Sequence, residues 1–337
     1  MQFQISTQPG GQRFEADSAQ TVLEAALAAG LLFPYGCRDG ACGACKAKVL
    51  SGSVEPGKAA DGALSDEERA QGYALLCQAR PRSDLLLSVR TVGRVGDIVP
   101  RKMPCRLISL EQAASDVMIL RLKLPASEQF RFRAGQYIDF LLPEGKRRSF
   151  SIANAPGQRN ELELHVRRVE DGHFTGYVFE SMKPREILRI EGPLGTFFLR
   201  EDSGRPIVLV AGGTGFAPIK GIIEHAIETG LSRPVTLYWG ARNREGLYLD
   251  ALARSWVASL PAFKYIPVLS EPAETDGWTE RTGLVHQAVM HDLPDLSDHE
   301  VYACGAPAMI DAARSDFVTR CGLSDDAFFA DAFTFSN

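Results

Sequence analysis

The fold is decided by the stretch Pro34-Tyr35-Gly36-Cys37-Arg38-Asp39-Gly40-Ala41-Cys42-Gly43-Ala44-Cys45. Its three cysteines have the spacing C-x4-C-x2-C, and a fourth, Cys77, stands alone further along in Leu75-Leu76-Cys77-Gln78-Ala79. Glycines separate the cysteines, and glycine adopts backbone angles that are closed to other residues. We therefore expect a tight loop in which main-chain amides approach a group that is held by thiolates.

Four cysteines in this spacing are typical of plant-type 2Fe-2S ferredoxins, in which they hold the cluster. Two alternatives remain. Disulfides are disfavoured because such crowded cysteines close only strained loops, and the chain begins without a secretory leader. Structural zinc sites usually pair two short cysteine knuckles, whereas here the fourth cysteine has no such partner. The expected ligands of the cluster are Cys37, Cys42, Cys45 and Cys77.

The composition is that of an ordinary globular chain with room for two or three domains. Its 337 residues are 45% hydrophobic and 23% charged, with a net charge of -5. This charge gives no footprint for nucleic acid, and no apolar run is long enough to span a membrane. Met1-Gln2-Phe3-Gln4-Ile5 reads as a strand rather than a signal peptide, so we expect a cytoplasmic protein.

Residues 1–92 read as a small mixed domain. A hairpin is expected from Phe3-Gln4-Ile5 and Arg13–Ala16, then a helix over residues 21–29 that Gly30 stops. Residues 45–50 predict a strand, and Ser65-Asp66-Glu67-Glu68 predicts a capped helix that delivers Cys77 to the loop. This segment resembles the ubiquitin-like 2Fe-2S ferredoxins over its whole length. The glycines, prolines and basic residues of 91–106 predict a tether to the next domain.

Two further domains are expected. Residues 103–201 contain short alternating strands at 117–124, 136–142, 149–152 and 161–167, which predict an antiparallel barrel. From 203 to 337, an apolar strand at 205–211 predicts a parallel α/β sheet that is covered on both faces. The expected fold class is therefore multidomain α/β: a ferredoxin domain, an antiparallel β-barrel and a parallel α/β nucleotide-binding domain.

The barrel segment resembles the flavin-binding domain of the ferredoxin-NADP reductase superfamily. Arg148-Ser149-Phe150-Ser151 matches its R-x-Y-S motif, with phenylalanine in place of the usual tyrosine. The resemblance implies that Arg148 pairs with the FAD pyrophosphate, Phe150 packs on the isoalloxazine ring, and Ser151 bonds near N5. It further implies that a strand end, His165-Val166-Arg167, approaches the flavin diphosphate or adenine half. A helix start, Gly172-His173-Phe174-Thr175, is expected to bind a phosphate, and its Gly172 and Thr175 match the family's G-x-x-S/T. Neither histidine is expected to transfer protons.

The last segment resembles the nicotinamide domain of the same superfamily. Gly212-Gly213-Thr214-Gly215-Phe216-Ala217-Pro218 fits its G-x-G-x-x-P turn, in which Pro218 takes the place of the third glycine of a Rossmann fingerprint. Cys304-Gly305-Ala306-Pro307-Ala308-Met309 resembles C-G-P-P-x-M, which implies that Cys304 lies beside the nicotinamide carbon that gives up hydride. Asp331 and Phe333 near the C-terminus are expected at the flavin face, or else simply in a packed strand.

The order of the three segments implies electron flow from NADH, with NADPH possible, through FAD and the 2Fe-2S cluster to a partner protein. Ser151 and Cys304 are the expected catalytic residues. The nearly full-length resemblance is to the CDP-6-deoxy-glucoseen reductase group, whose members serve a pyridoxamine-phosphate sugar dehydratase. The same architecture serves the reductases of aromatic-ring dioxygenases and of phenol or methane hydroxylases. A redox sensor or carrier without sustained turnover is the alternative from another class.

Overall fold

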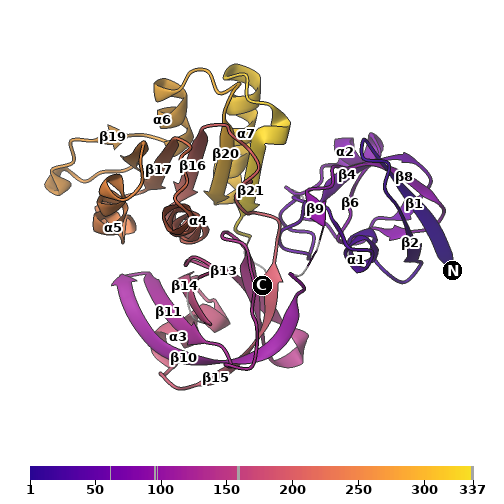
Figure 1. The fold of residues 1–337 in the computed structure, drawn as a ribbon, viewed down its shortest axis with the longest axis horizontal. Helices are drawn as coiled ribbons and strands as arrows, with labels where there is room; N and C mark the ends of the chain where they lie inside the picture. The colour runs from indigo at the N-terminus through magenta and orange to yellow at the C-terminus, as the bar shows by residue number, and fades with distance from the viewer. Residues whose placement is uncertain (61, 95, 97, 158–159, 335–337) are drawn as a thin grey trace. The chain divides into compact units, whose positions relative to one another are not determined.

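Two compact units make up the chain (Figure 1), and the structure is a computed structural model that describes residues 1–60, 62–94, 96, 98–157 and 160–334. One unit consists mainly of Met1–Val99 with Leu194–Thr196, and the other of Pro100–Pro193 with Phe197–Phe333. Val95 and Asp97 of the expected tether lie outside the described residues. No helix in the described part of the chain is long and apolar enough to cross a membrane.

The first unit is built on a five-stranded sheet in the order β2-β1-β8-β4-β6. The predicted hairpin is present as β1 (Gln2–Gln8) paired antiparallel with β2 (Arg13–Asp17). The helix α1 (Val22–Ala28) begins at Thr21, which forms a capping box with Glu24, and ends just before the left-handed Gly30. The remaining elements are β3 (Leu31–Leu32), β4 (Lys46–Ser51), β5 (Val54–Glu55), α2 (Asp66–Ala70), β6 (Tyr73–Leu75), β7 (Arg80–Pro81), β8 (Leu85–Ser88) and β9 (Gly93–Arg94).

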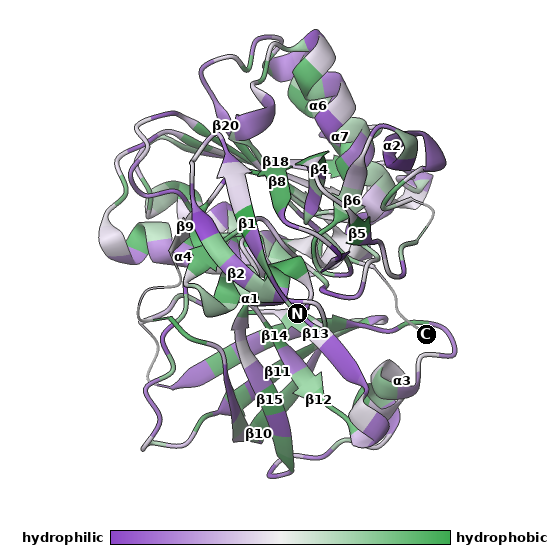
Figure 2. Ribbon diagram, turned by 90° about the vertical axis from the view of Figure 1, so that its right-hand side faces the viewer, coloured by the Kyte–Doolittle hydropathy of each residue, from purple (hydrophilic) through white to green (hydrophobic). Residues whose placement is uncertain are grey.

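An antiparallel barrel forms the first half of the second unit, as predicted. Six strands follow the order β13-β12-β15-β10-β11-β14, and a bridge from Ile152 to Leu164 joins the two ends of the sheet. Figure 2 shows hydrophilic and hydrophobic colours along β10, β11 and β15, as expected where one face of each strand lines a core. The elements are β10 (Arg101–Ala114), β11 (Val117–Lys123), β12 (Tyr137–Leu141), β13 (Arg147–Ser151), β14 (Glu161–Arg167), α3 (His173–Glu180), β15 (Ile187–Leu194) and the 3-10 turn η1 (Pro143–Gly145).

The prediction of a tether over 91–106 is wrong at its C-terminal end. The long strand β10 begins at Arg101 and pairs with β15 along its first half. Met103, Cys105 and Leu107 are buried in the barrel core while their neighbours are exposed. The basic residues and Pro104 suggested a linker, although every second residue from Met103 to Leu107 is apolar, which is the alternation expected of a strand.

The second half of this unit is a parallel sheet in the order β19-β18-β17-β16-β20-β21. Along β16 (Ile207–Gly212), Leu209 belongs to a core beneath α4 (Phe216–Thr229), whereas Val208 and Val210 belong to a core beneath α6 and α7. The sheet is therefore covered on both faces, as predicted. The other elements are η2 (Gly213–Gly215), β17 (Val235–Ala241), η3 (Arg244–Gly246), α5 (Asp250–Ser255), η4 (Trp256–Ala258), β18 (Phe263–Leu269), η5 (Glu274–Asp276), β19 (Arg281–Thr282), α6 (Val285–Asp292), β20 (Glu300–Gly305), α7 (Pro307–Arg320), η6 (Asp325–Ala327) and β21 (Phe328–Ala332).

Candidate functional site

The four cysteines predicted to hold a cluster meet as two pairs. The amide of Cys37 lies 3.3 Å from Cys42 Sγ, and the amide of Cys42 lies 3.3 Å from Cys37 Sγ. The amide of Cys77 lies 3.5 Å from Cys45 Sγ. The second pair is set by the sheet, because β4 pairs with β6 and the ladder continues with the Leu76 amide donating to the Cys45 carbonyl oxygen.

The cysteine loop has the expected left-handed backbone, although at partly different positions. Gly40 and Gly43 have φ values of +87° and +72°. Gly36 is not left-handed, and Arg38 adopts φ +64° instead. A side chain at Gly40 would meet the Lys58 carbonyl oxygen at 2.5 Å, so this glycine is required by space as well as by angle.

The donor set fits a cluster of two irons. A hydrogen bond to the neighbouring thiol and burial raise the pKa of Cys37, beside Cys42, and of Cys45, beside Cys77. Crowded thiols lose their protons when a metal cation takes their place. In the described residues no three metal-ligating side chains lie close enough to share one ion, whereas two irons with one thiol pair each match this arrangement.

The predicted flavin motif lies on β13 with its side chains on alternate faces. Phe150 is half-buried and packs 5.5 Å from Phe174, while the Ser149 hydroxyl donates to Asp139 Oδ1 at 2.6 Å. The Arg148 guanidinium is half-buried and donates from one nitrogen to the Arg147 carbonyl oxygen. Its other nitrogens have no protein partner among the described residues, so they are open to an anion such as a pyrophosphate.

The side chains of His165-Val166-Arg167 do not all face a cofactor site as the resemblance implied. His165 and Val166 point into the interior, and both ring nitrogens of His165 have protein partners. A cofactor contact by these two residues is thus restricted to their main chain. The Arg167 guanidinium lies beside the nucleotide turn, since a Cβ placed on Gly213 would be 2.7 Å from its Nη1 atom.

The helix α3 begins at Gly172 without a capping side chain. The Thr175 hydroxyl instead accepts from the Val169 amide at 3.1 Å and donates to the Gly172 carbonyl oxygen at 3.2 Å. It closes the turn that precedes the helix. The first amides of α3 remain open to a phosphate, which fits the predicted seat, whereas the threonine hydroxyl is already used by the protein.

The nucleotide turn is backbone packed on backbone. Gly213 has φ +53°, and a side chain at Gly215 would lie 2.1 Å from the Cys304 carbonyl oxygen. Gly305 in turn approaches Gly212, with 3.1 Å from its added Cβ to the Gly212 Cα. Thr214 is buried between them, and Pro218 occupies the third position of α4, where its missing amide costs nothing.

The predicted catalytic residues Ser151 and Cys304 share a neighbour, Asp331. The β20–β21 ladder places Cys304 opposite Asp331, and the Ser151 hydroxyl lies 3.5 Å from Asp331 Oδ2. Burial and the Asp331 charge raise the pKa of Cys304 well above its usual value, so it is a neutral thiol. Burial raises the pKa of Asp331 to about 6, although the Ser151 hydrogen bond opposes this. Phe333 follows β21, where its amide donates to the Gly305 carbonyl oxygen.

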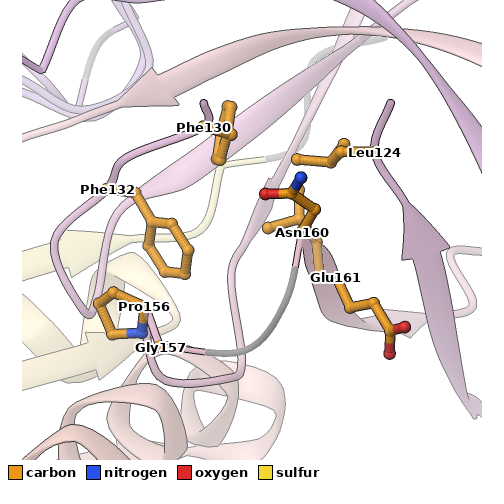
Figure 3. Close-up of a pocket in the computed structure, with 8 residues that line it drawn as sticks. Leu124, Phe130, Phe132, Pro156, Gly157, Asn160 and Glu161 are labelled. Atoms are coloured by element: carbon orange, nitrogen blue, oxygen red, sulfur yellow. The ribbon is translucent and has the colours of Figure 1, made fainter. Parts of the chain in front are cut away.

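A small hollow elsewhere in the barrel contains none of the predicted site residues (Figure 3). It has a volume of about 160 Å³, below the roughly 300–1,000 Å³ of typical ligand pockets. Phe130 and Phe132 line one side and Leu124 another. We assign it no function.

Sequence motifs did not identify every residue of the site. The Gln78 amide nitrogen lies 3.9 Å from Cys77 Sγ and donates to the Arg38 carbonyl oxygen at 3.1 Å. Glu163, Lys220 and Tyr248 form a buried network with His165. In the sequence, only the position of Gln78 next to the expected ligand Cys77 pointed to a place near the cluster. No local pattern singled out Glu163, Lys220 or Tyr248.

Comparison with known proteins gives three domain families along the chain. A 2Fe-2S iron-sulfur cluster binding domain matches residues 5–82, an oxidoreductase FAD-binding domain matches 104–199, and an oxidoreductase NAD-binding domain matches 209–315. Together with the folds and sites described above, they define an iron-sulfur flavoprotein oxidoreductase of the ferredoxin-reductase type that uses a 2Fe-2S cluster, FAD and NAD.

Full-length relatives identify the family more closely. The chain is 44% identical over 333 residues to the CDP-6-deoxy-L-threo-D-glycero-4-hexulose-3-dehydrase reductase of Yersinia pseudotuberculosis, covering 99% of both chains. It is 35% identical to the reductase component 2 of terephthalate 1,2-dioxygenase from Comamonas sp, covering 99% of this chain and 98% of that one. The crystal structure of the Amycolatopsis cytochrome P450 reductase GcoB matches with a TM-score of 0.81 and 36% identity, covering 99% and 100%. The chain belongs to the family of iron-sulfur flavoprotein reductases that contains these hexulose-dehydrase and oxygenase reductases.

Proposed function

We propose that this reductase passes electrons from NADH to a pyridoxamine-phosphate dehydratase acting on a CDP-linked deoxyhexulose. The observation that carries the proposal is the 44% identity, over 99% of both chains, to a reductase named for that dehydrase. The oxygenase reductase component cited above is 35% identical over a similar length. This difference favours the sugar pathway as the source of the acceptor.

We assign the flavin to the open end of β13 and the start of α3. Arg148 has free guanidinium nitrogens that suit the pyrophosphate, and Phe150 presents a half-buried ring for packing against the isoalloxazine. The amides that follow Gly172 suit a phosphate. Phe150 lacks the hydroxyl of the usual tyrosine, so Ser151 is the buried hydroxyl group of the motif, while Ser149 is exposed.

We assign the coenzyme to the turn between β16 and α4. Gly212 and Gly213 are half-buried at the start of this turn, and the buried Thr214, Gly215 and Pro218 continue it into the first turn of α4. A glycine-rich turn at a helix N-terminus suits a pyrophosphate. Arg167 adds a positive charge beside Gly213. Its position favours contact with the coenzyme phosphates, rather than the flavin contact that the motif implied.

When bound, the nicotinamide supplies two electrons as hydride, the flavin releases them singly, and the cluster accepts one at a time. The protein orients and tunes these groups. Ser151 and Asp331 place a hydroxyl and a carboxylate where β13 and β21 meet, and Gly305 lets the strand end lie flat against the turn. The thiol of Cys304 is completely buried, so it excludes water while remaining uncharged.

Reconstitution with purified partners tests the acceptor. The chain is mixed under anaerobic conditions with a dehydratase loaded with its CDP-hexulose substrate, and NADH oxidation and deoxysugar product are measured. We expect the dehydratase to accelerate NADH oxidation by at least about tenfold. The variant C77A should lose this acceleration, whereas C321A, which removes a buried cysteine far from the cluster loop in sequence, should retain it.

Two other outcomes decide against the proposal. If an aromatic-ring oxygenase component is reduced rapidly and the dehydratase is not, the chain is an oxygenase reductase. If NADH bleaches the flavin slowly with every acceptor, including cytochrome c, the chain is a sensor or carrier. We also propose a division into domains at 1–92, 103–201 and 203–337, and a cytoplasmic location, which the free thiols of Cys105, Cys304 and Cys321 beside an iron-sulfur loop support.

A further inference from the structure

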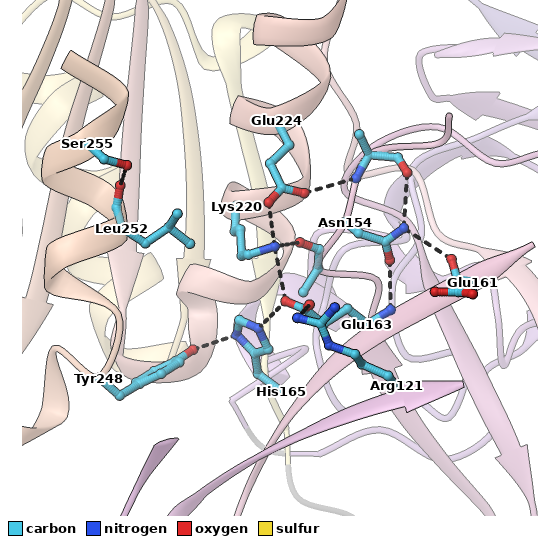
Figure 4. A network of polar contacts seen from close by, with 12 residues as sticks. Arg121, Asn154, Glu161, Glu163, His165, Lys220, Glu224, Tyr248, Leu252 and Ser255 are labelled. Atoms are coloured by element: carbon cyan, nitrogen blue, oxygen red, sulfur yellow. Dashed lines mark hydrogen bonds and ion pairs between the residues drawn. The ribbon is translucent and has the colours of Figure 1, made fainter. Parts of the chain in front are cut away.

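A buried polar cluster joins the flavin barrel to the nucleotide-binding sheet within the second unit (Figure 4). Lys220 projects from α4, and its side chain is only 6% exposed. Its ammonium donates to Glu224 Oε1 at 2.6 Å and to the Ala153 carbonyl oxygen at 3.0 Å, and lies 3.0 Å from Glu163 Oε1. Each of its three protons therefore has a partner, and two of the partners belong to the barrel.

The cluster continues through His165, and the protonation states of its members decide which atom donates each hydrogen bond. Burial raises the pKa of Glu163, but the His165 hydrogen bond and the Lys220 charge outweigh it and lower this pKa to about 2. Glu163 is thus a carboxylate that can only accept, so His165 Nε2 donates to it at 3.1 Å. Burial lowers the pKa of His165, which is therefore neutral and has a bare Nδ1. That nitrogen accepts from the Tyr248 hydroxyl at 2.8 Å.

From Tyr248 the contacts lead to the nucleotide turn. The Tyr248 ring meets the edge of Trp239 at 5.3 Å and 90°. Trp239 stacks on Phe216, the first residue of α4, at 3.7 Å. The Trp239 indole nitrogen donates to the Gly213 carbonyl oxygen at 3.0 Å. One continuous set of contacts therefore extends from Glu163 in β14 to the turn.

Stability alone is a weak explanation for such a network. A buried ion pair often adds nothing over apolar side chains of the same shape, because the desolvation of both charges offsets their attraction. Directional bonds do provide a fixed geometry, since Glu163 Oε1 meets both Lys220 and His165, and each ring nitrogen of His165 has a partner on a different side. Hydride transfer depends on the distance between the flavin and the nicotinamide. That distance in turn depends on how the barrel strand β14 and the nucleotide turn are held together.

We propose that Glu163, His165, Lys220 and Tyr248 are positioning residues that hold the nucleotide turn against β14, so that the nicotinamide ring meets the flavin at transfer distance. They need not touch either cofactor. The inference rests on the proposed path from NADH to FAD. It predicts that damage to the network slows hydride transfer while coenzyme affinity is nearly kept, because the phosphate-binding backbone itself remains.

The variant Y248F provides the sharpest test, since it removes one hydroxyl and keeps the aromatic packing. We expect the rate of flavin bleaching at saturating NADH to fall about tenfold, with the NADH dissociation constant changed by less than about threefold. The control is Y265F, which removes the hydroxyl of another half-buried tyrosine, in β18, bonded to Asp250 at 2.9 Å. It should leave both quantities within about twofold of the wild type.

A second pair of variants separates positioning from folding. In K220M with E163Q the two most deeply buried charges are removed together. Glu224 and Arg121 lose these partners, but their side chains are 20% and 53% exposed, so water can solvate them. This double variant should bind FAD, melt near the wild-type temperature and still transfer hydride about tenfold more slowly. Wild-type transfer rates in the double variant, or equal effects of Y248F and Y265F, overturn the inference alone. A wild-type protein that NADH does not bleach overturns the inference and the proposed function together.

Discussion

The hydroxyl of Ser151 in β13 lies 3.5 Å from the carboxylate of Asp331 in β21, 180 positions further along the chain. Asp331 also lies opposite Cys304 in the β20–β21 ladder. Since Cys304 is a neutral thiol, Asp331 is the charged group at this point, and its pKa of about 6 lies within the physiological range. Two consequences of this raised pKa can be measured separately.

The first consequence is a pH dependence of flavin reduction. A nicotinamide becomes positively charged when it gives up hydride, and at the proposed coenzyme site an ionised Asp331 would stabilise that charge. The rate of flavin bleaching by NADH should therefore fall as pH decreases through about 6. In D331N the rate should be slower and flat in this range. Anaerobic stopped-flow absorbance checks this, and an unchanged inflection in D331N would assign it to another group.

The second consequence is a stability effect with the opposite sign. The folded-state pKa of Asp331 is raised, so its contribution to stability is greatest below the unfolded pKa of 3.8 and is lost as pH rises through about 6. At pH 7 the charge of this half-buried carboxylate costs up to about 3 kcal/mol. D331N should thus be more stable than the wild type at pH 7, with the difference shrinking near pH 4. Urea unfolding at both values measures it, and a destabilised D331N contradicts it.

Tight backbone packing at the nucleotide turn makes Gly215 sensitive to a single methyl group. A Cβ there would lie 2.1 Å from the Cys304 carbonyl oxygen, so the turn or β20 must move. G215A should cost about 1–3 kcal/mol of stability and weaken NADH binding at least about tenfold. Gly204 has open space around it and serves as the control, since G204A should change neither quantity. Coenzyme titration and thermal unfolding provide the two measurements.

Local signals predicted much of this molecule and failed where distant segments meet. The cysteine spacing, the capping box of α2 and the apolar strand β16 are each encoded within a few neighbouring residues. The pairing of Glu163 with Lys220 depends on the packing of a barrel strand on a helix, so no motif announces it. The motif around His165 indicated a flavin contact, yet its ring is committed to that network. Strand β10 was missed because a proline and basic residues obscured its alternation.

Gln78 is expected to tune the cluster. Its side-chain amide approaches Cys77 Sγ, and it is packed closely by Gly40 and Gly57, whose added Cβ atoms would lie 3.1 and 3.0 Å from it. A hydrogen bond to a ligand sulfur favours the reduced cluster, which carries more negative charge. Q78M keeps the length and loses the donor, so the midpoint potential should fall by about 59 mV, a tenfold change in the reduction equilibrium.

The control for this titration is Gln71, an exposed glutamine that contacts Glu67 on α2. Q71M should leave the potential unchanged. The cluster signal in electron paramagnetic resonance, followed during a redox titration, reports the potential without any need for turnover. A potential in Q78M equal to that of Q71M would show that the amide acts only in packing the loop.

Coenzyme choice should depend on Arg242. It lies two positions after Gly240, which pairs with Gly212 at the nucleotide turn, and its exposed guanidinium has no side-chain partner among the described residues. A free guanidinium suits a 2'-phosphate, yet this stretch resembles those of NADH-using reductases, so we expect a modest preference for NADH. R242A should leave kcat/KM for NADH within about threefold and lower that for NADPH about tenfold. Arg205, exposed before the opposite end of β16, is the matched control, because R205A should affect neither coenzyme. Equal use of both coenzymes by the wild type, unchanged in R242A, would show that neither the preference nor the role of Arg242 is real.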